Sequence, residues 1–255
     1  MVTLAQKIEL PAAYVLVEAG EVDDLRQYAA GVAAAGAEEG TIVYAHSQRQ
    51  PKGIGGKPWM AYPDNLHASI ILEPEFAADR YHEMVYVALV SLGNAVAAHV
   101  SPMTALSYGW PNDLRIAGNK IGSIWLDAGT NASGPWLSLT CSVNVRHGPM
   151  DFDMAAMSIL EAEGSSDLSA VGLLETWAKQ FITQINDWAE RGFSHTLSAW
   201  RVRAEFIGEQ VHIERQGKVI EGQYMSVTEA GEMELQGHDG LSSLISVEDY
   251  MAWNA

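Results

Sequence analysis

The sequence of 255 residues contains a single cysteine, Cys141, and few basic residues. One cysteine can form no internal disulfide and cannot supply the sulfur ligands of a zinc cluster. Fifteen lysines and arginines stand against 32 aspartates and glutamates, which gives a formal net charge of −17. Because such a surface repels phosphate backbones, we expect no nucleic-acid partner, and any anion site must be built locally from a few lysines and backbone N–H groups.

Long hydrophobic runs are also missing. No segment is long and apolar enough to span a membrane, and Lys7 and Glu9 follow too soon after Met1 for the apolar core of a signal peptide. The eight histidines are scattered, with no His-x-x-x-His pair on a helix, so we expect no metal site. Since 48% of the residues are hydrophobic, the composition predicts an acidic, globular, cytoplasmic protein with no membrane partner.

Hydrophobic periodicity predicts mixed helices and strands in the first 200 residues. Strands are expected at 12–20, 40–48, 66–74 and 135–146, and helices at 21–37, 78–100 and 167–192. Asp167 is expected to cap the last helix and Gly192 to end it. Residues 104–110 and 120–129 are expected to pair as a hairpin around 112–119.

The pattern changes near residue 200. Residues 208–246 form short alternating segments separated by turn signals, among them Ala230-Gly231 and Asp239-Gly240. This pattern predicts a small antiparallel barrel or sandwich. We therefore expect an α/β domain at 1–199 and a small β-barrel domain at 200–255.

A loop rich in glycine and lysine lies at 49–65. Its backbone could come close to a ligand, and its lysines would add positive charge. An exposed, lysine-bearing surface loop explains the same composition, and no Gly-Lys-Ser/Thr sequence opens a helix as a P-loop requires. The candidate ligand-binding residues here are Lys52, Gly53, Gly55, Gly56 and Lys57.

A second candidate site is Trp110-Pro111-Asn112-Asp113, followed by Lys120. The proline ends the strand, so the amide of Asn112 and the carboxylate of Asp113 would lie at a strand end. The returning strand would bring Lys120 back towards Asp113, where an ammonium could stabilise a phosphate or a developing oxyanion. An exposed Asn-Asp turn with a solvated lysine remains the alternative on these grounds.

The segment "WPNDLRIAGNKIGSIWLD" (110–127) resembles the signature of the biotin and lipoate protein ligase family. Three further blocks occur in the order of that family: the glycine and lysine loop before Trp59, "DNLHASIIL" (64–72) and "SLTCSVNVR" (138–146). The resemblance extends over about residues 10–200. The C-terminal segment is similar to the small SH3-like barrel that many biotin ligases carry.

The resemblance implies a mixed β-sheet flanked by helices, of the class II synthetase-like type. Members of the family use ATP and Mg²⁺ to form an acyl-adenylate of biotin or a lipoate-like acid. They then transfer the acyl group to a lysine of a carrier-protein domain. The resemblance leaves open whether this chain forms a homodimer.

The resemblance also implies roles for individual residues. Lys120 would contact the carboxyl group of the acid and the phosphate, and Asp113 would lie near the adenylate and the acceptor amine. Asn112 would shape the pocket, and Asn144 would lie beside the nucleotide. The ligand loop would comprise Lys52, Gly53, Gly55, Gly56, Lys57 and Trp59.

The sequence departs from the family pattern at three places. Glu18-Ala19-Gly20-Glu21 stands where biotin ligases place Asp/Glu-Ser-Thr-Asn after the first strand. Lysine, isoleucine and glycine replace the usual loop arginines at positions 52–57, and Gly109 replaces a lysine before the Trp-Pro-Asn-Asp motif. A lysine reproduces the bidentate phosphate contact of an arginine only as a point charge.

Three functions are therefore consistent with the sequence. ATP-dependent ligation is the leading hypothesis. An ATP-independent acyltransferase of the octanoyl type would need an exposed, reactive cysteine, whereas Cys141 falls in a predicted core strand, where a buried thiol is expected. A non-catalytic homologue that binds a ligand is the third hypothesis, and a narrow, filled pocket would favour it.

Overall fold

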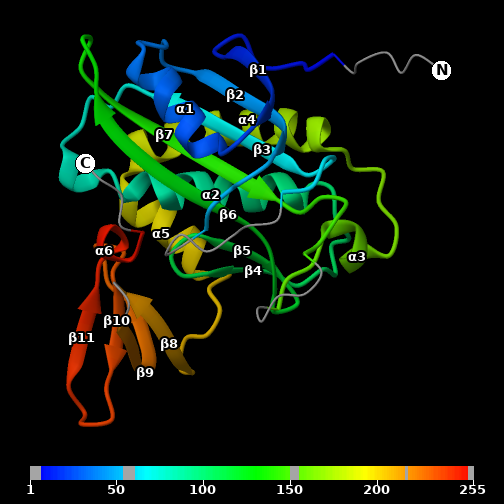
Figure 1. Cartoon of the computed structure of the whole chain (residues 1–255). Coiled ribbons are helices and arrows are strands. Elements are labelled where there is room, and N and C mark those ends of the chain that lie inside the picture. The colour runs from blue at the N-terminus through cyan, green and yellow to red at the C-terminus, as the bar shows by residue number, and fades with distance from the viewer. Residues whose placement is uncertain (1–6, 54–60, 150–154, 216–217, 252–255) are drawn as a thin grey trace.

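The computed structural model describes residues 7–53, 61–149, 155–215 and 218–251 (Figure 1). The N-terminal part is built from a seven-stranded sheet and helices, and the C-terminal part from a four-stranded sheet. The elements of the first part are β1 (Val15–Val22), α1 (Leu25–Ala34), β2 (Thr41–Gln48), β3 (Leu66–Leu72), η2 (Ala78–Arg80), α2 (Glu83–Ala97), β4 (Leu106–Gly109), β5 (Asp113–Ile116), β6 (Asn119–Thr130), β7 (Pro135–Val143), α3 (Ile159–Glu163), α4 (Ala170–Arg191) and α5 (Phe193–Arg201).

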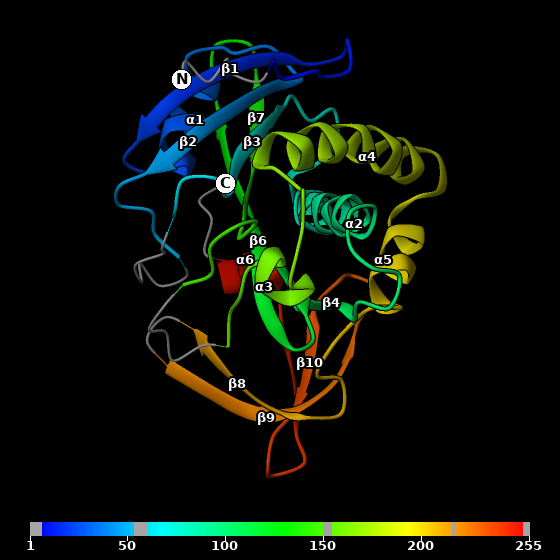
Figure 2. The same cartoon turned by 90° about the vertical axis from the view of Figure 1, so that its right-hand side faces the viewer.

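The large sheet has the strand order β1-β2-β3-β7-β6-β5-β4. Only β1 and β2 pair in parallel; the other neighbours are antiparallel, so the sheet is mixed. Alternate residues of β2 face opposite sides: Ile42 packs with α2, whereas Val43 packs against α1. Helices therefore cover both faces, with α1 on one side and α2 and α4 on the other (Figure 2). The expected mixed α/β fold is confirmed.

Helix α2 lies in the middle of the main core. It is apolar nearly all round, as expected of a helix packed between a sheet and another helix. Its few polar groups have partners: Trp177 Nε1 of α4 donates to Ser91 Oγ at 3.0 Å, and Trp188 Nε1 donates to Glu83 Oε2 at 2.5 Å. The prediction of a buried helix is confirmed, although it begins at Glu83 rather than at residue 78.

The boundaries of α4 and β1 correct two predictions. Ser169, not Asp167, caps α4: its backbone is extended and its side chain accepts from Gly172 N. Gly192, with φ +80°, ends the helix as predicted. Strand β1 continues to Val22 rather than ending at Gly20, because a register shift against β2 at Gly20 lets the strand resume.

The C-terminal part is an antiparallel sheet with the order β11-β10-β9-β8, followed by a short helix. Its elements are β8 (Gln210–Arg215), β9 (Lys218–Val227), β10 (Met233–Gln236), β11 (Ser242–Ile245) and α6 (Val247–Met251). The predicted turns at Ala230-Gly231 and Asp239-Gly240 are present. The prediction of a small antiparallel β unit at the C-terminus is confirmed. The short helix α6 was not predicted.

The two parts are joined by direct contacts. Tyr86 Oη and Trp110 Nε1 both donate to the carbonyl of Gly231, at 2.6 and 3.0 Å. The linker after α5 runs beside β4, where Tyr108 N donates to Arg203 O and Glu205 N donates to Tyr108 O. These contacts join residues on either side of position 200. The predicted division into one domain at 1–199 and another at 200–255 therefore stays a prediction.

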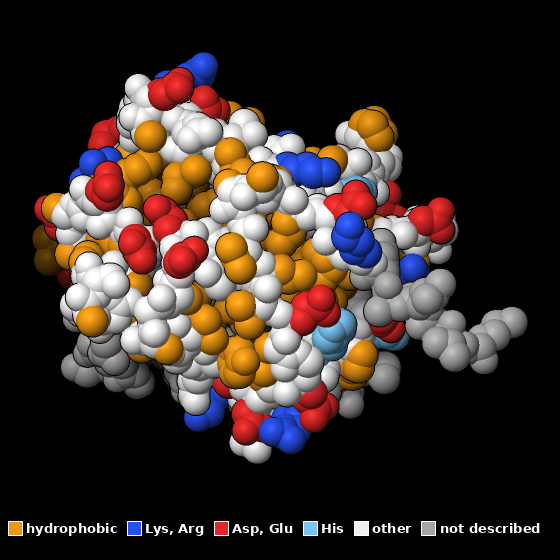
Figure 3. Space-filling model, turned by 90° about the horizontal axis from the view of Figure 1, so that it is seen from above, with side chains coloured by type: hydrophobic (Ala, Val, Ile, Leu, Met, Phe, Trp, Pro, Cys, Tyr) orange, Lys and Arg blue, Asp and Glu red, His pale blue; other side chains and the backbone are white. Residues whose placement is uncertain are grey.

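The surface of the described residues agrees with the acidic composition. On the face seen from above, lysine and arginine side chains lie scattered among acidic and apolar ones and form no continuous patch within the described part (Figure 3). None of the helices in the described ranges combines the length and the apolar character that crossing a membrane requires.

Candidate functional site

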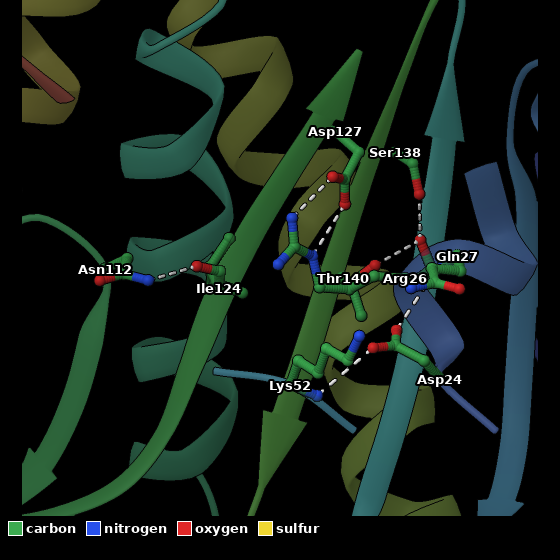
Figure 4. Close-up of polar contacts among 10 residues, drawn as sticks. Asp24, Arg26, Gln27, Lys52, Asn112, Ile124, Asp127, Ser138 and Thr140 are labelled. Atoms are coloured by element: carbon green, nitrogen blue, oxygen red, sulfur yellow. Dashed lines mark hydrogen bonds and ion pairs between the residues drawn. The ribbon is translucent and has the colours of Figure 1, made fainter. Parts of the chain in front are cut away.

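The Trp-Pro-Asn-Asp motif forms the turn between β4 and β5. The peptide bond between Trp110 and Pro111 is cis. Asn112 is fully buried and is fixed on β6: its Nδ2 donates to Ile124 O at 2.8 Å, and its own carbonyl accepts from Ile124 N at 3.0 Å (Figure 4). The amide of Asn112 therefore holds the turn in register with β6.

The predicted hairpin is wrong in one respect. Residues 112–119 are not a loop, because β5 occupies 113–116 and pairs with both β4 and β6. The chain turns twice, once at the motif and once at Ala117-Gly118, where both residues have positive φ. Asp113 is thus the first residue of a strand that is paired on both sides, which gives its side chain a fixed direction.

Lys120 and Asp113 form an ion pair, as their spacing predicted. Lys120 Nζ lies 2.6 Å from Asp113 Oδ1, and the two side chains are 8% and 20% exposed. A short, charge-assisted contact in a largely buried position is stronger than the same pair on an open surface. The pair places a fixed ammonium and a carboxylate at the junction of β5 and β6.

Arg115 and Glu205 lie beside this pair and are not among the residues predicted from the sequence. Arg115 Nη1 lies 3.6 Å from Asp113 Oδ2, and its Nε lies 2.9 Å from Glu205 Oε2. Arg115 is two residues after Asp113, so on a strand both side chains point to the same face. That period was available in the sequence, but Glu205 is 90 positions further along the chain than Arg115 and gave no signal there.

Asn144 belongs to the same hydrogen-bonded unit as Lys120. Its Nδ2 donates to Met157 O at 3.2 Å, and its backbone N donates to Ile121 O at 2.7 Å. Met157 N in turn donates to the carbonyl of Lys120 at 3.0 Å. The structure thus brings Lys120, Asp113, Asn112 and Asn144 together around the strands β5, β6 and β7.

The ligand loop is described only in part. Lys52 is exposed, and its backbone N donates to Asp24 Oδ2 at 3.3 Å (Figure 4). Gly53 is partly exposed, while Gly55, Gly56, Lys57 and Trp59 lie outside the described residues. Asp24 is buried and also caps α1, so a single carboxylate joins the start of this loop to a helix N-terminus.

The segment after the first strand also needs correction. Residues 18–21, which the family resemblance places after the first strand, lie inside β1. The polar residues between β1 and α1 are Asp23 and Asp24. Next to them, the buried Gln48 accepts a hydrogen bond from Leu25 N at 2.7 Å. Asp24 and Gln48 were missed because their place at the helix N-terminus depends on where β1 ends.

Two hollows adjoin these residues. One, of about 340 Å³, lies between the β4–β5 turn and β8 and is lined by Trp110, Asp113, Arg115 and Tyr224 among others. The other, of about 370 Å³, is lined by Asp64, Arg146, His147, Leu160, Ser169 and Ala170. The second adjoins Asn65, whose Nδ2 donates to His147 O at 2.8 Å and contacts Asn144 Oδ1 at 3.4 Å.

Two buried titratable groups lie in the sheet. Burial lowers the pKa of His67 on β3 to about 4, although a contact with the carbonyl of Tyr62 opposes the shift. Burial raises the pKa of the Cys141 thiol far above its usual value, and the side chain is fully inaccessible. His67 therefore stays neutral at pH 7, and Cys141 stays a thiol.

Clustered metal ligands are not found in the part of the chain that the structure describes: no group of three or more His, Cys, Asp or Glu side chains is placed to hold a metal ion. The carboxylate nearest to the predicted site, Asp113, is engaged by Lys120. Arg146 and Lys120 are the cations beside the Asn144 end of the site.

Comparisons with known proteins agree with this fold. The family described as "Biotin/lipoate A/B protein ligase family" matches residues 10–202. The biotin–[acetyl-CoA-carboxylase] ligase of Paracoccus denitrificans is 24% identical in an alignment of 217 residues that covers 81% of this chain and 88% of that protein.

Solved structures are similar over nearly their full length. A biotin protein ligase-like protein from Silicibacter sp. has a TM-score of 0.76 and 26% identity, covering 96% of this chain and 98% of that one. The biotin protein ligase of Aquifex aeolicus in complex with biotin and ATP has a TM-score of 0.76 and 19% identity, with coverages of 92% and 96%. At 19% identity, the similarity to the Aquifex structure shows a shared fold and no more. Because the family match extends over most of the chain and includes Asp113, Lys120 and Asn144, this chain belongs to the biotin/lipoate A/B protein ligase family.

Proposed function

We propose that the protein ligates biotin, or a lipoate-like acid, to a lysine of a carrier-protein domain in two ATP-dependent steps. The observation that carries the proposal is the ion pair of Lys120 and Asp113, held on adjacent strands with Nζ 2.6 Å from Oδ1. Biotin is favoured over lipoate because the Paracoccus relative is a biotin–carboxylase ligase and the Aquifex structure contains biotin and ATP. A carboxylase carrier domain is the favoured acceptor on the same ground.

In the first step, a carboxylate oxygen of the acid attacks the α-phosphorus of ATP. The bond between the α-phosphorus and the bridging oxygen breaks, and the products are the acyl-adenylate and pyrophosphate. Negative charge accumulates on the α-phosphate oxygens in the transition state. The ammonium of Lys120 would stabilise this charge without reorganising, since the strand and Asp113 already hold it in place.

In the second step, the neutral amine of the acceptor lysine attacks the acyl carbon. An amide forms, AMP leaves, and the amine loses one proton. The carboxylate of Asp113 would lie near the acceptor amine and accept that proton. The hollow beside Asp113 lies on the side of β8, so the C-terminal sheet would border the approach of the acceptor.

Mg²⁺ would enter this site with the phosphates of ATP. A magnesium ion is commonly held by one or two carboxylates together with substrate phosphates and water. Lys52, Gly53 and Arg146 are the described residues that could contribute further contacts to phosphate or to the acid.

Acid-dependent exchange of labelled pyrophosphate into ATP tests the first step. Biotin, lipoate and octanoate are compared in wild type, in Lys120→Ala and in Lys179→Ala, which removes an exposed lysine from α4. We expect exchange with biotin that is lost in Lys120→Ala and retained in Lys179→Ala. Folded protein that exchanges none of the three acids would contradict the proposal and favour a non-catalytic ligand-binding homologue.

The ATP-independent acyltransferase is disfavoured by one observation. That mechanism needs a reactive thiol, and Cys141 is fully buried on β7, between β3 and β6, where burial raises its pKa. A cytoplasmic location and a possible homodimer remain predictions from the sequence and the family resemblance.

A further inference from the structure

We propose that Arg115 and Glu205 are positioning residues, which hold the Asp113 carboxylate beside Lys120 and make its orientation depend on the linker to the C-terminal sheet. The inference rests on the proposed function for its catalytic readout. A second readout, the NMR signal of Lys120, is independent of that function.

Four charged side chains form a continuous chain. Lys120 Nζ contacts Asp113 Oδ1 at 2.6 Å, Asp113 Oδ2 faces Arg115 Nη1 at 3.6 Å, and Arg115 Nε contacts Glu205 Oε2 at 2.9 Å. The four side chains are between 8% and 21% exposed. Both oxygens of Asp113 are therefore engaged by cations, which fixes the carboxylate more tightly than Lys120 could by itself.

Glu205 is held by the linker and by β4. Its Oε1 accepts from Ser107 Oγ of β4, and its backbone N donates to Tyr108 O at 2.9 Å. The next residue, Phe206, places its ring 5.1 Å from the guanidinium of Arg115. The position of Arg115 is thus set by residues 205 and 206, which lie just before β8.

Arginine suits this role better than lysine. Its planar guanidinium can contact two carboxylates and an aromatic face at the same time, whereas an ammonium is a single point of charge. Arg115 Nη2 also donates to the carbonyl of Gly118 in the β5–β6 turn, two residues before Lys120. Arg115 therefore connects the strand of Asp113, the turn that leads to Lys120 and the linker.

The charges of the cluster balance, with two cations and two anions. Removing one member leaves a partly buried charge without its partner, and the remaining side chains must rearrange. Because a small misplacement of a catalytic group costs a large factor in rate, we expect the effect mainly on kcat rather than on ground-state binding.

The catalytic test compares Arg115→Met, Arg115→Lys and Glu205→Gln, with Arg201→Met as the matched control. Arg201 also joins the two parts, through Glu229 and the carbonyl of Val227, but no contact links it to Asp113 among the described residues. We expect Arg115→Met to lower kcat roughly 10- to 100-fold with little change in KM for ATP. Arg115→Lys should recover part of the loss, and Glu205→Gln should add little in the Arg115→Met background.

A loss of kcat as large in Arg201→Met as in Arg115→Met would overturn the proposal, because packing between the two parts would then explain the effect. The proposal is equally contradicted if Arg115→Lys is no better than Arg115→Met, or if the double variant shows additive losses. Circular dichroism confirms that each variant is folded, and Glu205→Gln keeps the test informative if Arg115→Met does not fold.

The second readout follows Lys120 directly by NMR with ¹³Cε-labelled lysine, without ATP or acid. The chain contains only six lysines, so the spectrum is simple, and Lys120→Arg assigns the signal. We expect the Lys120 signal to move in Arg115→Met and Glu205→Gln and to stay in place in Arg201→Met. An unmoved Lys120 signal in Arg115→Met would overturn the proposal that Arg115 positions the Lys120–Asp113 pair. This holds even for a protein that exchanges no pyrophosphate.

Discussion

Lys120 Nζ lies 2.6 Å from Asp113 Oδ1, and only six residues separate the two along the chain. The contact is possible because the chain reverses at Ala117-Gly118, between β5 and β6, and so returns Lys120 to the side of Asp113. The pair is largely buried, so neither charge can be removed without consequence for its partner. A ligand brought to this edge of the sheet would meet an ammonium and a carboxylate whose positions are already set.

Asp113→Asn is expected to impair both catalysis and stability. The amide has the shape of the carboxylate but leaves Lys120 and Arg115 without their shared anion, so the free energy of unfolding should fall by about 1–3 kcal/mol. Urea denaturation measures this change. The matched control is Glu83→Gln, which breaks a pair with Arg80, Nε to Oε1 2.8 Å, at the start of α2. That control should lose stability yet retain pyrophosphate exchange; loss of exchange in both variants would contradict the assignment of Asp113.

We expect the free energy of unfolding to decrease as the pH is lowered from about 6.5 to about 4, because His67 is buried in its neutral form. Its folded pKa is about 4, below the unfolded value of 6.5, so the unfolded state binds more protons in this window. The stabilisation is complete above pH 6.5 and is lost progressively as pH falls, up to about 3 kcal/mol. Denaturation of His67→Gln across this range should show a smaller slope than wild type, whereas His99→Gln, which removes an exposed histidine, should not. An unchanged slope in His67→Gln would show that other groups cause the pH dependence.

Cys141 is expected to be inert in the native protein. Because the thiol is fully buried and its pKa is raised, a thiol reagent should label it more than 100-fold more slowly, as an order-of-magnitude estimate, than in urea. Cys141→Ala should retain acid-dependent exchange, at a modest cost in stability from the small cavity. Rapid labelling of the native protein, or loss of acyl transfer from a folded Cys141→Ala variant, would instead support the cysteine-dependent acyltransferase.

Gly231→Ala is expected to loosen the contact between the two parts. A Cβ at Gly231 would lie 2.9 Å from Tyr86 Cε2 and 3.2 Å from Phe193 Cζ, and φ is +79°. We expect a loss of about 2–4 kcal/mol in the free energy of unfolding. Gly240→Ala is a close control, since its φ is also +79° but no atom lies within 4 Å of the added Cβ. Equal losses in the two variants would assign the whole effect to the backbone and none to the contact with Tyr86.

Much of the fold could be predicted from local patterns. The buried helix α2, the strands β2, β3 and β7, the end of α4 at Gly192 and the small C-terminal sheet all follow from periodicity and turn residues. These features depend on neighbours in sequence and on burial, which a periodic pattern reports directly. The errors lie at boundaries: β1 passes Gly20, Ser169 caps α4, and β5 interrupts the expected hairpin.

The candidate site divides in the same way. The sequence by itself predicted that Lys120 returns towards Asp113, because the segments 104–110 and 120–129 with Gly118 between them favour a hairpin. The motif resemblance pointed to the same residues. Only the tertiary structure decided that Glu205 meets Arg115, that Gly231 accepts from Trp110 and that Asp24 holds the backbone of Lys52. Each of these contacts joins distant segments, and its existence depends on strand order and register, which arise from packing of the whole chain rather than from any local pattern.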